Sequence, residues 1–187
     1  MDRHEQLRAC ERLERSAQQS FFEEFKDSMM VVCLRYAKNE AQANDFLLGT
    51  FKLFFNNFVA PAAKVEDIEA WVKTQFINEL VVLILANKQE YKIVSTALPQ
   101  EELVPQLTLT NEELLPLIHS QKLLPAVQSL PTAYRLILNL LLVDGFEIKK
   151  IEDKLDIGEA MIRLNLEKAL HLLRKNLSEG KTNSYGQ

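Results

Sequence analysis

Side chains that could support acid–base or metal chemistry are few and scattered in this sequence. Three histidines stand alone, a pattern more typical of surface or packing residues than of metal ligands or general bases: His4, His119 and His171. Two pairs of adjacent acids are most simply solvated charges in a linker or at a helix start: Glu101-Glu102 and Glu112-Glu113. We therefore predict no catalytic residue and no metal site.

Motifs that bind nucleotides or activate nucleophiles are absent as well. The sequence contains no GxGxxG, GxxxxGK(S/T), HExxH or GxSxG, and its five glycines are too scattered to cradle a phosphate. Cys10 and Cys33 lie in expected helices without a CxxC pattern or a neighbouring histidine, so neither a disulfide framework nor a zinc site is indicated. The sequence thus predicts a protein that is not an enzyme, has no cofactor or small-molecule substrate, and keeps its thiols reduced.

Composition limits the broad class of the protein. Its 187 residues carry 22 basic and 26 acidic side chains, a formal net charge of −4, which disfavours a polycationic nucleic-acid coat but leaves room for a local basic patch. Apolar residues make up 47% of the chain and charged residues 26%, as in ordinary soluble domains. Only five glycines and six prolines leave little material for turns between strands, so we predict an all-α fold.

Neither export nor membrane insertion is indicated by the apolar segments. The N-terminal stretch MDRHEQLRACERLERSAQQ is charged throughout and lacks the apolar core of a signal peptide. The longest apolar run, Leu80 to Ala86, has seven residues, whereas a membrane span needs roughly 20. We therefore expect a cytoplasmic protein that does not bind a membrane.

The first block of the chain, residues 1–92, is predicted to be a helical domain. Apolar side chains follow helical spacing over residues 21–58, in two stretches that break near Asn39. Asn44 and Asp45 lie close to the expected start of the second helix, where short polar and acidic side chains suit the helix dipole.

A third helix is expected in this block, from near Val65 toward Tyr91. Trp71 lies within it at helical spacing from apolar neighbours, which favours a place in the core over a stacking platform. Nine of the ten phenylalanines precede Ile77, so the first block is predicted to have an aromatic core of its own.

Residues 93–129 are predicted to form an acidic linker. Four prolines interrupt this segment, and residues 99–125 hold four acids against one base. One short helix, NEELLPLIHSQ, is expected inside it. At the other end of the chain, residues 179–187 are predicted to form a flexible tail because they have nothing to bury.

Residues 130–178 are predicted to form a helix-turn-helix domain. Its first helix begins at Leu130-Pro131 and ends at Asp144-Gly145. A short helix over residues 148–155, a turn containing Gly158 and a longer helix over residues 159–177 complete the arrangement.

Several groups of residues also occur in the order and spacing of one protein family. The stretch from Tyr36 to Phe51 is similar to the family pattern RY…DAEDLVQEVF, and Trp71 with Asn78 follows its W……N. In the second block, Leu130-Pro131 with Arg135 and Asp144-Gly145-Phe146 matches the family pattern LP…R…L…EG. Ile148, Ile151 and Leu155 follow its EIAEIL segment, and Ile162 through Arg174 follows TVKSRLxRAxxxLR. Over about residues 20–178 the chain therefore resembles the extracytoplasmic-function (ECF) type of bacterial RNA polymerase sigma factor.

The resemblance implies function for both blocks. Residues 1–92 resemble sigma region 2 and would dock on core RNA polymerase through four positions: Asn44, Asp45, Leu48 and Phe51. Residues 130–178 resemble sigma region 4 and would bind promoter DNA. Three side chains would face the bases and three the phosphates: Arg163, Asn165 and Lys168, then Lys149, Lys150 and Arg174. An anti-sigma factor would be a further partner.

The chain departs from the family pattern where charge matters most. Asn44, Leu48 and Gly49 stand where the family has Glu, Gln and Glu, and a glycine inside a helix costs roughly 1 kcal/mol relative to alanine. The third helix has no base between Lys73 and Lys88, although family members carry arginines there that hold the promoter backbone. Since DNA affinity comes largely from phosphate neutralisation, the first block is expected to bind DNA poorly.

Three hypotheses follow from these patterns. The first is a sigma factor that directs promoter-specific transcription initiation. The second is a degenerate sigma-like binding or regulatory protein that keeps the fold and a protein interface but has lost promoter melting. The third is an unrelated helical regulator, which would need dimer symmetry to bind a palindromic site.

Overall fold

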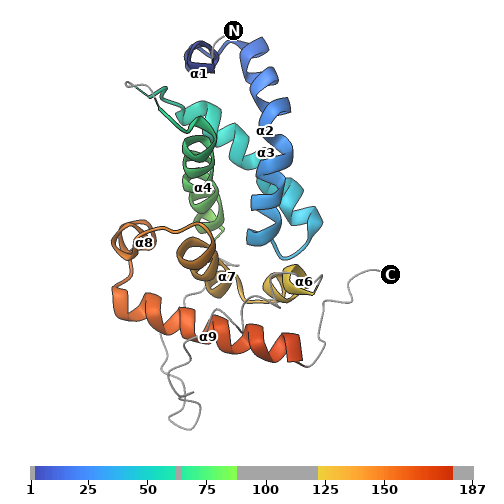
Figure 1. Ribbon diagram of the computed structural model, residues 1–187, viewed down its shortest axis with the longest axis vertical. Coiled ribbons are helices and arrows are strands. Elements are labelled where there is room, and N and C mark those ends of the chain that lie inside the picture. The colour runs from blue at the N-terminus through green and yellow to red at the C-terminus, as the bar shows by residue number, and fades with distance from the viewer. Residues whose placement is uncertain (1–2, 62–64, 88–121, 179–187) are drawn as a thin grey trace. The chain divides into compact units, whose positions relative to one another are not determined.

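A computed structural model describes residues 3–61, 65–87 and 122–178. All regular secondary structure in these ranges is helical, which confirms the predicted all-α class. The chain divides into two compact units, Met1–Asn87 and Lys88–Gln187 (Figure 1). Each unit has its own core and is described by itself.

The first unit consists of four described helices: α1 (Arg3–Glu11), α2 (Arg15–Tyr36), α3 (Glu40–Asn57) and α4 (Ile68–Ala86). The predicted break near Asn39 is confirmed, because the Asn39 side chain caps α3 by accepting a hydrogen bond from the Gln42 amide (2.9 Å). The third helix is likewise capped, by Asp67, which accepts from the Ala70 amide (2.9 Å). Helix α3 thus begins four residues before the polar pair expected at its start, and Tyr91 lies outside the described residues.

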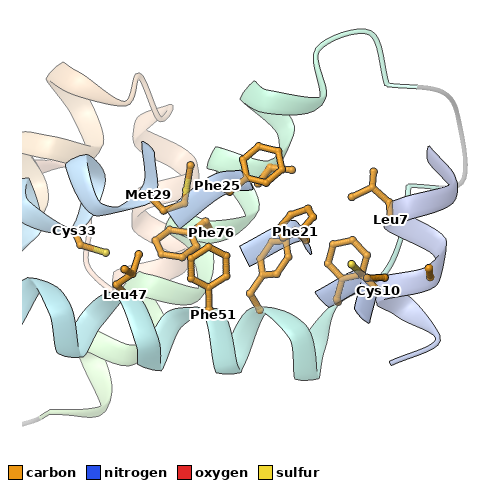
Figure 2. Close-up of a cluster of buried hydrophobic side chains, with 14 of the residues drawn as sticks. Leu7, Cys10, Phe21, Phe25, Met29, Cys33, Leu47, Phe51 and Phe76 are labelled. Carbon is orange, nitrogen blue, oxygen red and sulfur yellow. The ribbon is translucent and has the colours of Figure 1, made fainter. Parts of the chain in front are cut away.

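The core of the first unit is aromatic, as predicted. Rings from three helices meet within it: Phe22 of α2 packs edge-on against Phe51 of α3 (4.9 Å between centroids), which in turn packs against Phe76 of α4 (5.0 Å). Figure 2 shows Phe21, Phe51 and Phe76 pointing into the space between the helices. Trp71 is half-buried and packs edge-on against Phe58 (5.9 Å), so its predicted place in the core is confirmed.

Both cysteines belong to this core. Burial raises the pKa of Cys10 to about 11, with a smaller contribution from the charge of Glu14, and raises the pKa of Cys33 to about 12. Each thiol is free and buried within the first unit. Neither side chain is placed to react or to bind a metal.

The three long helices of this unit alternate in direction. Phe21 near the start of α2 lies 6.4 Å from Phe58 at the end of α3, so these two helices are antiparallel. Asn57 at the end of α3 donates to Glu79 of α4 (2.9 Å), whereas Gly49, nearer the start of α3, approaches Leu83 further along α4. Helices α3 and α4 are therefore antiparallel too, and α2 and α4 run in the same direction.

The second unit is built on one long helix. Its described elements are α6 (Leu123–Gln128), α7 (Thr132–Leu138), the π-helix η2 (Asn139–Val143), α8 (Ile148–Leu155) and α9 (Glu159–Ser178). Helices α6, α7 and α8 all pack against α9 (Figure 1). Helix α6 lies in residues predicted to be linker, so the helical unit begins before residue 130. The rest of the predicted linker, its NEELLPLIHSQ helix and the tail lie outside the described residues.

A buried arginine holds the connection between α6 and α7. The Arg135 guanidinium donates through Nη1 to the carbonyl oxygens of Gln128 (2.8 Å) and Leu130 (2.7 Å). These carbonyls lie near the end of α6, where helical partners run out. Asn176 of α9 donates to Ser129 Oγ in the same connection (2.7 Å). Arg135, which matched the family pattern, thus has a structural role in this unit.

Two helix bounds predicted for this part of the chain are confirmed, namely the short helix Ile148–Leu155 and the start of the long helix at Glu159. Asp156 adopts a left-handed conformation (φ 53°) that ends α8. The Glu152 carboxylate of α8 accepts a hydrogen bond from the Glu159 amide at the start of α9 (2.7 Å). This bond joins the end of one helix to the start of the next and fixes the turn.

Candidate functional site

Helix α3 carries the four residues predicted to bind polymerase, and three of them share its exposed surface. Asn44, Asp45 and Leu48 are exposed, with Leu48 62% accessible. We call these three residues the docking face, after the polymerase contact predicted for them. An exposed leucine between two polar residues suits a protein partner, because interfaces combine apolar contacts with a polar rim.

Phe51 is a correction to the predicted polymerase contacts. It is only 3% exposed and touches rings from α2 and α4, so it stabilises the core and cannot meet a partner. Asn44 and Phe51 are seven residues apart and hence lie on nearly the same side of the helix. Asn44 is exposed whereas Phe51 is buried, so α2 and α4 cover this side of α3 near Phe51 but leave it open near Asn44.

The glycine next to the docking face brings α3 close to α4. A Cβ atom on Gly49 would lie 2.9 Å from Leu83 Cδ2, so a larger side chain would require Leu83 to move. Because the atom it would meet is the far end of a flexible, half-buried side chain, a small movement of Leu83 would make room for an alanine. On the α4 side of this contact, Val82 is exposed and Leu83 half-buried, and the part of α4 that follows Lys73 carries no basic residue to hold a DNA backbone.

The predicted DNA contacts of the second unit divide into exposed and buried groups. Lys149 and Lys150 on α8 are exposed, and Arg163 on α9 is exposed, whereas Arg174 is half-buried. The Arg163 guanidinium forms an ion pair with Glu159 one turn earlier, with Nη2 2.6 Å and Nε 2.8 Å from Glu159 Oε1. Arg163 is therefore already engaged by a carboxylate.

Asn165 and Lys168 are corrections, because neither side chain lies on the exposed side of α9. Asn165 is 0% exposed and donates through Nδ2 to the Met161 carbonyl (2.8 Å), and Lys168 is 5% exposed. The buried residues of this helix follow one stripe, in which Asn165 lies between Ile162 and Ala169. That spacing was visible in the sequence and could have placed the asparagine inside.

Acidic side chains surround the start of α9, the end that a helix-turn-helix directs toward DNA. Glu152 accepts from the first amide of the helix, Glu159 lies in its first turn, and Asp156 is exposed in the turn before it. Backbone amides at a helix start attract phosphate, but here a carboxylate already takes one of them. Sequence patterns had not singled out these acids, although Glu159 and Arg163 stand four residues apart, the spacing of a helical ion pair.

Other chemistry finds little support in the described part of the chain. Within residues 3–61, 65–87 and 122–178, no three His, Cys, Asp or Glu side chains come together to hold a metal ion. None of the helices in these ranges combines the length and the apolarity that a membrane crossing requires. His171 is an exposed residue of α9 and His4 belongs to α1, whereas His119 and the two predicted acid pairs lie outside these ranges.

Comparison with known proteins does not identify a relative. No protein-family model matches the chain, and no curated protein matches it significantly. Function therefore has to be inferred from the residues and their geometry.

Proposed function

We propose that this chain is a sigma-type transcription protein that binds core RNA polymerase through the docking face on α3 and carries a helix-turn-helix to promoter DNA. The observation that carries the proposal is the pair α8 and α9, with the bounds expected from the ECF sigma pattern and a turn fixed by the Glu152–Glu159 bond. The helical unit that precedes it presents Asn44, Asp45 and Leu48 where that pattern places polymerase contacts.

The wider organisation of the protein belongs to the same proposal. Two domains, formed by residues 1–92 and by a helix-turn-helix domain that ends at residue 178, are joined by an acidic linker, so that each can reach its own target. The protein acts in the cytoplasm, where polymerase and promoter DNA are found. An anti-sigma factor is a further expected partner. No catalytic step and no cofactor are involved.

Reconstitution with core polymerase tests the proposal directly. The wild-type chain is expected to form a stable complex and to start transcription at a defined site. Leu48→Glu should weaken the complex by about tenfold or more, because it places a charge at the centre of the docking face. Val59→Glu is the matched control, since Val59 is 69% exposed and follows α3. The absence of a stable wild-type complex would refute the proposal.

A second candidate function is favoured by the charges around α9 and α4. This candidate is a sigma-like regulatory protein that binds polymerase without melting or reading a promoter. Its support is the Arg163–Glu159 ion pair, the burial of Asn165 and Lys168, and the apolar surface at Val82 and Leu83. All three features lower the number of phosphate or base contacts that the protein can make.

Titration of labelled duplex DNA against the full chain separates the two candidates. A sigma factor should bind with an affinity that falls steeply with salt, by about 0.9 log units per phosphate contact and per log unit of salt. Lys149→Glu with Lys150→Glu should then reduce both the affinity and the slope. Weak binding with a shallow slope, together with a stable polymerase complex, would favour the second candidate.

A further inference from the structure

The turn between α1 and α2 contains a leucine in a backbone conformation that leucine rarely adopts. Leu13 has a φ of 60°, in the left-handed region that favours glycine or a short polar residue. Asp156 is the one other non-glycine residue with a positive φ in the described ranges, and aspartate tolerates this region because its short side chain can form local hydrogen bonds. A leucine side chain cannot do so, and the backbone at Leu13 is therefore strained.

The way in which α1 ends requires this strained conformation. The Leu13 amide donates to the Cys10 carbonyl (3.0 Å). The Glu14 amide donates to the Ala9 carbonyl (3.0 Å). These two bonds form a Schellman motif, which places a left-handed residue, usually glycine, directly after the helix. Leu13 occupies this position with its side chain 63% exposed, so burial of the leucine does not offset the strain.

Helix α1 is also held to the rest of the first unit by little apolar contact. It has nine residues and packs chiefly against α2, and a helix of this length is not stable in water without packing. Of its buried residues Leu7, Ala9 and Cys10, only Leu7 has a large side chain. Figure 2 shows Leu7 and Cys10 beside the aromatic core to which Phe21 belongs. One large side chain therefore provides most of the apolar burial that keeps α1 in place.

Polar groups add little to this attachment. Arg3 links α1 to Glu24 of α2 (3.0 Å) and to Glu69 of α4 (3.5 Å), and the ion pairs of Arg12 lie within α1 and its turn. All these side chains are substantially exposed, and exposed ion pairs contribute little to stability. His4 Nε2 is buried and forms no hydrogen bond with the residues that the structure describes. A buried polar atom without a partner favours any conformation in which water reaches it.

We propose that α1 is a cap poised to open, which leaves α2 as a unit about the turn at Leu13 while α2, α3 and α4 stay folded. Opening allows Leu13 to take an ordinary conformation and exposes the His4 nitrogen to water. It also uncovers the end of the aromatic core beside Phe21, so α1 controls access to this apolar surface. Weakly held elements open locally in this way in otherwise stable proteins. The proposal does not depend on polymerase binding.

The two cysteines report on this opening. Cys10 lies in α1 and Cys33 in α2, and both are 0% exposed. Labelling of the full wild-type chain with iodoacetamide, followed by mass spectrometry of its peptides, gives a separate rate for each thiol. Where the rate is proportional to the reagent concentration, it measures the population of the form in which that thiol is accessible. Cys10 should react at least about tenfold faster than Cys33, because it needs only the cap to open.

Substitution of Leu13 tests whether strain favours the open form. Leu13→Gly relieves the strain in the closed form and should slow the labelling of Cys10 about fivefold, which is about 1 kcal/mol at 1.4 kcal/mol per tenfold change. Leu13→Ala is the matched control. It also lacks the exposed leucine side chain but keeps the Cβ atom that causes the strain, so the rate should stay within about twofold of wild type.

A substitution in the core tests whether α1 opens separately. Ile84 of α4 is buried, and under the proposal its surroundings are the same whether the cap is open or closed. Ile84→Val should therefore speed the labelling of Cys33 about fivefold, because it favours unfolding of the whole unit. The rate at Cys10 should not change.

Three outcomes would overturn the proposal. Equal rates for Cys10 and Cys33 in the wild-type chain would mean that α1 opens only when the whole unit unfolds. A parallel rise of both rates in Ile84→Val would lead to the same conclusion. Equal effects of Leu13→Gly and Leu13→Ala would remove backbone strain as the cause of opening.

Discussion

Helices α3 and α9 were both expected to bind a partner, but they differ in how many of their predicted contact residues are exposed. On α3, three of four predicted contacts are exposed and only Phe51 is buried. On α9, Asn165 and Lys168 are buried and Arg163 is paired with an acid. A helix can thus keep the residue pattern of a binding element while its neighbours remove individual side chains from the surface.

The largest expected effect is a loss of stability on substitution of Phe51, which a substitution in the docking face should not cause. Phe51→Ala should lower the free energy of unfolding by about 3–5 kcal/mol, because it empties space among packed rings. Leu48→Ala should change it by no more than about 0.5 kcal/mol. Urea titrations followed by fluorescence of Trp71, the single tryptophan, measure both. Equal losses would contradict the division of α3 into a core side and a docking face.

Arg135 provides the corresponding test for the second unit. Arg135→Ala should cost about 2–3 kcal/mol, since one buried and one part-buried carbonyl group lose their donor, and an unsatisfied buried group costs about 1–3 kcal/mol. Circular dichroism should report a lower melting temperature while the Trp71 signal of the first unit is unchanged. Lys149→Ala is the exposed control. A matching shift in Trp71 fluorescence would mean that the two units unfold together.

Alkaline pH should lower the stability of the first unit, because both of its cysteines are buried as neutral thiols. Burial raises the pKa of Cys10 to about 11 and of Cys33 to about 12, from a usual value of 9.0. The stabilisation by protonated thiols is complete below pH 9 and is lost as the pH rises through these values, because the unfolded chain ionises first. Trp71 fluorescence should therefore give falling urea midpoints between pH 9 and 11. A double Cys10→Ala, Cys33→Ala variant should flatten this dependence.

Asn165→Leu tests whether the buried amide has any part in DNA contact. The Asn165 Oδ1 atom accepts no hydrogen bond from the residues that the structure describes, so an apolar side chain of similar size should raise stability by up to about 1 kcal/mol. Affinity for duplex DNA should not change. If the asparagine reads a base instead, affinity should fall by about 1–3 kcal/mol.

The smallest effect is expected from the ion pair on α9. Glu159→Gln should lower stability by no more than about 0.5 kcal/mol, because both partners are exposed. The same change releases Arg163 and should raise affinity for duplex DNA several-fold at low salt. Arg163→Ala is the matched control, with the same small loss of stability and no gain in binding. Unchanged affinity in Glu159→Gln would mean that this arginine does not approach DNA.

Local signals predicted most of the described helices. The α8–α9 arrangement followed from apolar spacing and from Gly158 in a short turn. The break near Asn39 likewise followed from apolar spacing, whereas the capping role of the Asn39 side chain was not predicted. Helix α6 was missed because Pro125 lies in an otherwise linker-like segment, although a proline in the first turn of a helix is well tolerated. What makes α6 stable is its packing on α9, which no local pattern reveals.

The candidate site was predicted less completely, and two positions explain why. Phe51 matched a family contact but was also suited to a core, and only the rings of α2 and α4 decide between these roles. Asn165 has a side chain that can read adenine, yet it occupies the buried stripe of α9. Residue type determines what a side chain can do, whereas exposure depends on segments far away in the sequence.

The sequence by itself determined that the protein is helical, where most of its helices begin and end, and that it lacks the motifs of nucleotide enzymes. These properties depend on neighbours within a few residues, through capping, helical spacing and the scarcity of turn formers. Only the tertiary structure decided that Arg135 holds the connection between α6 and α7 and that the Glu152 carboxylate of α8 meets the start of α9. Each of these features joins residues from different helices or connections, so its energy exists only after the chain has folded.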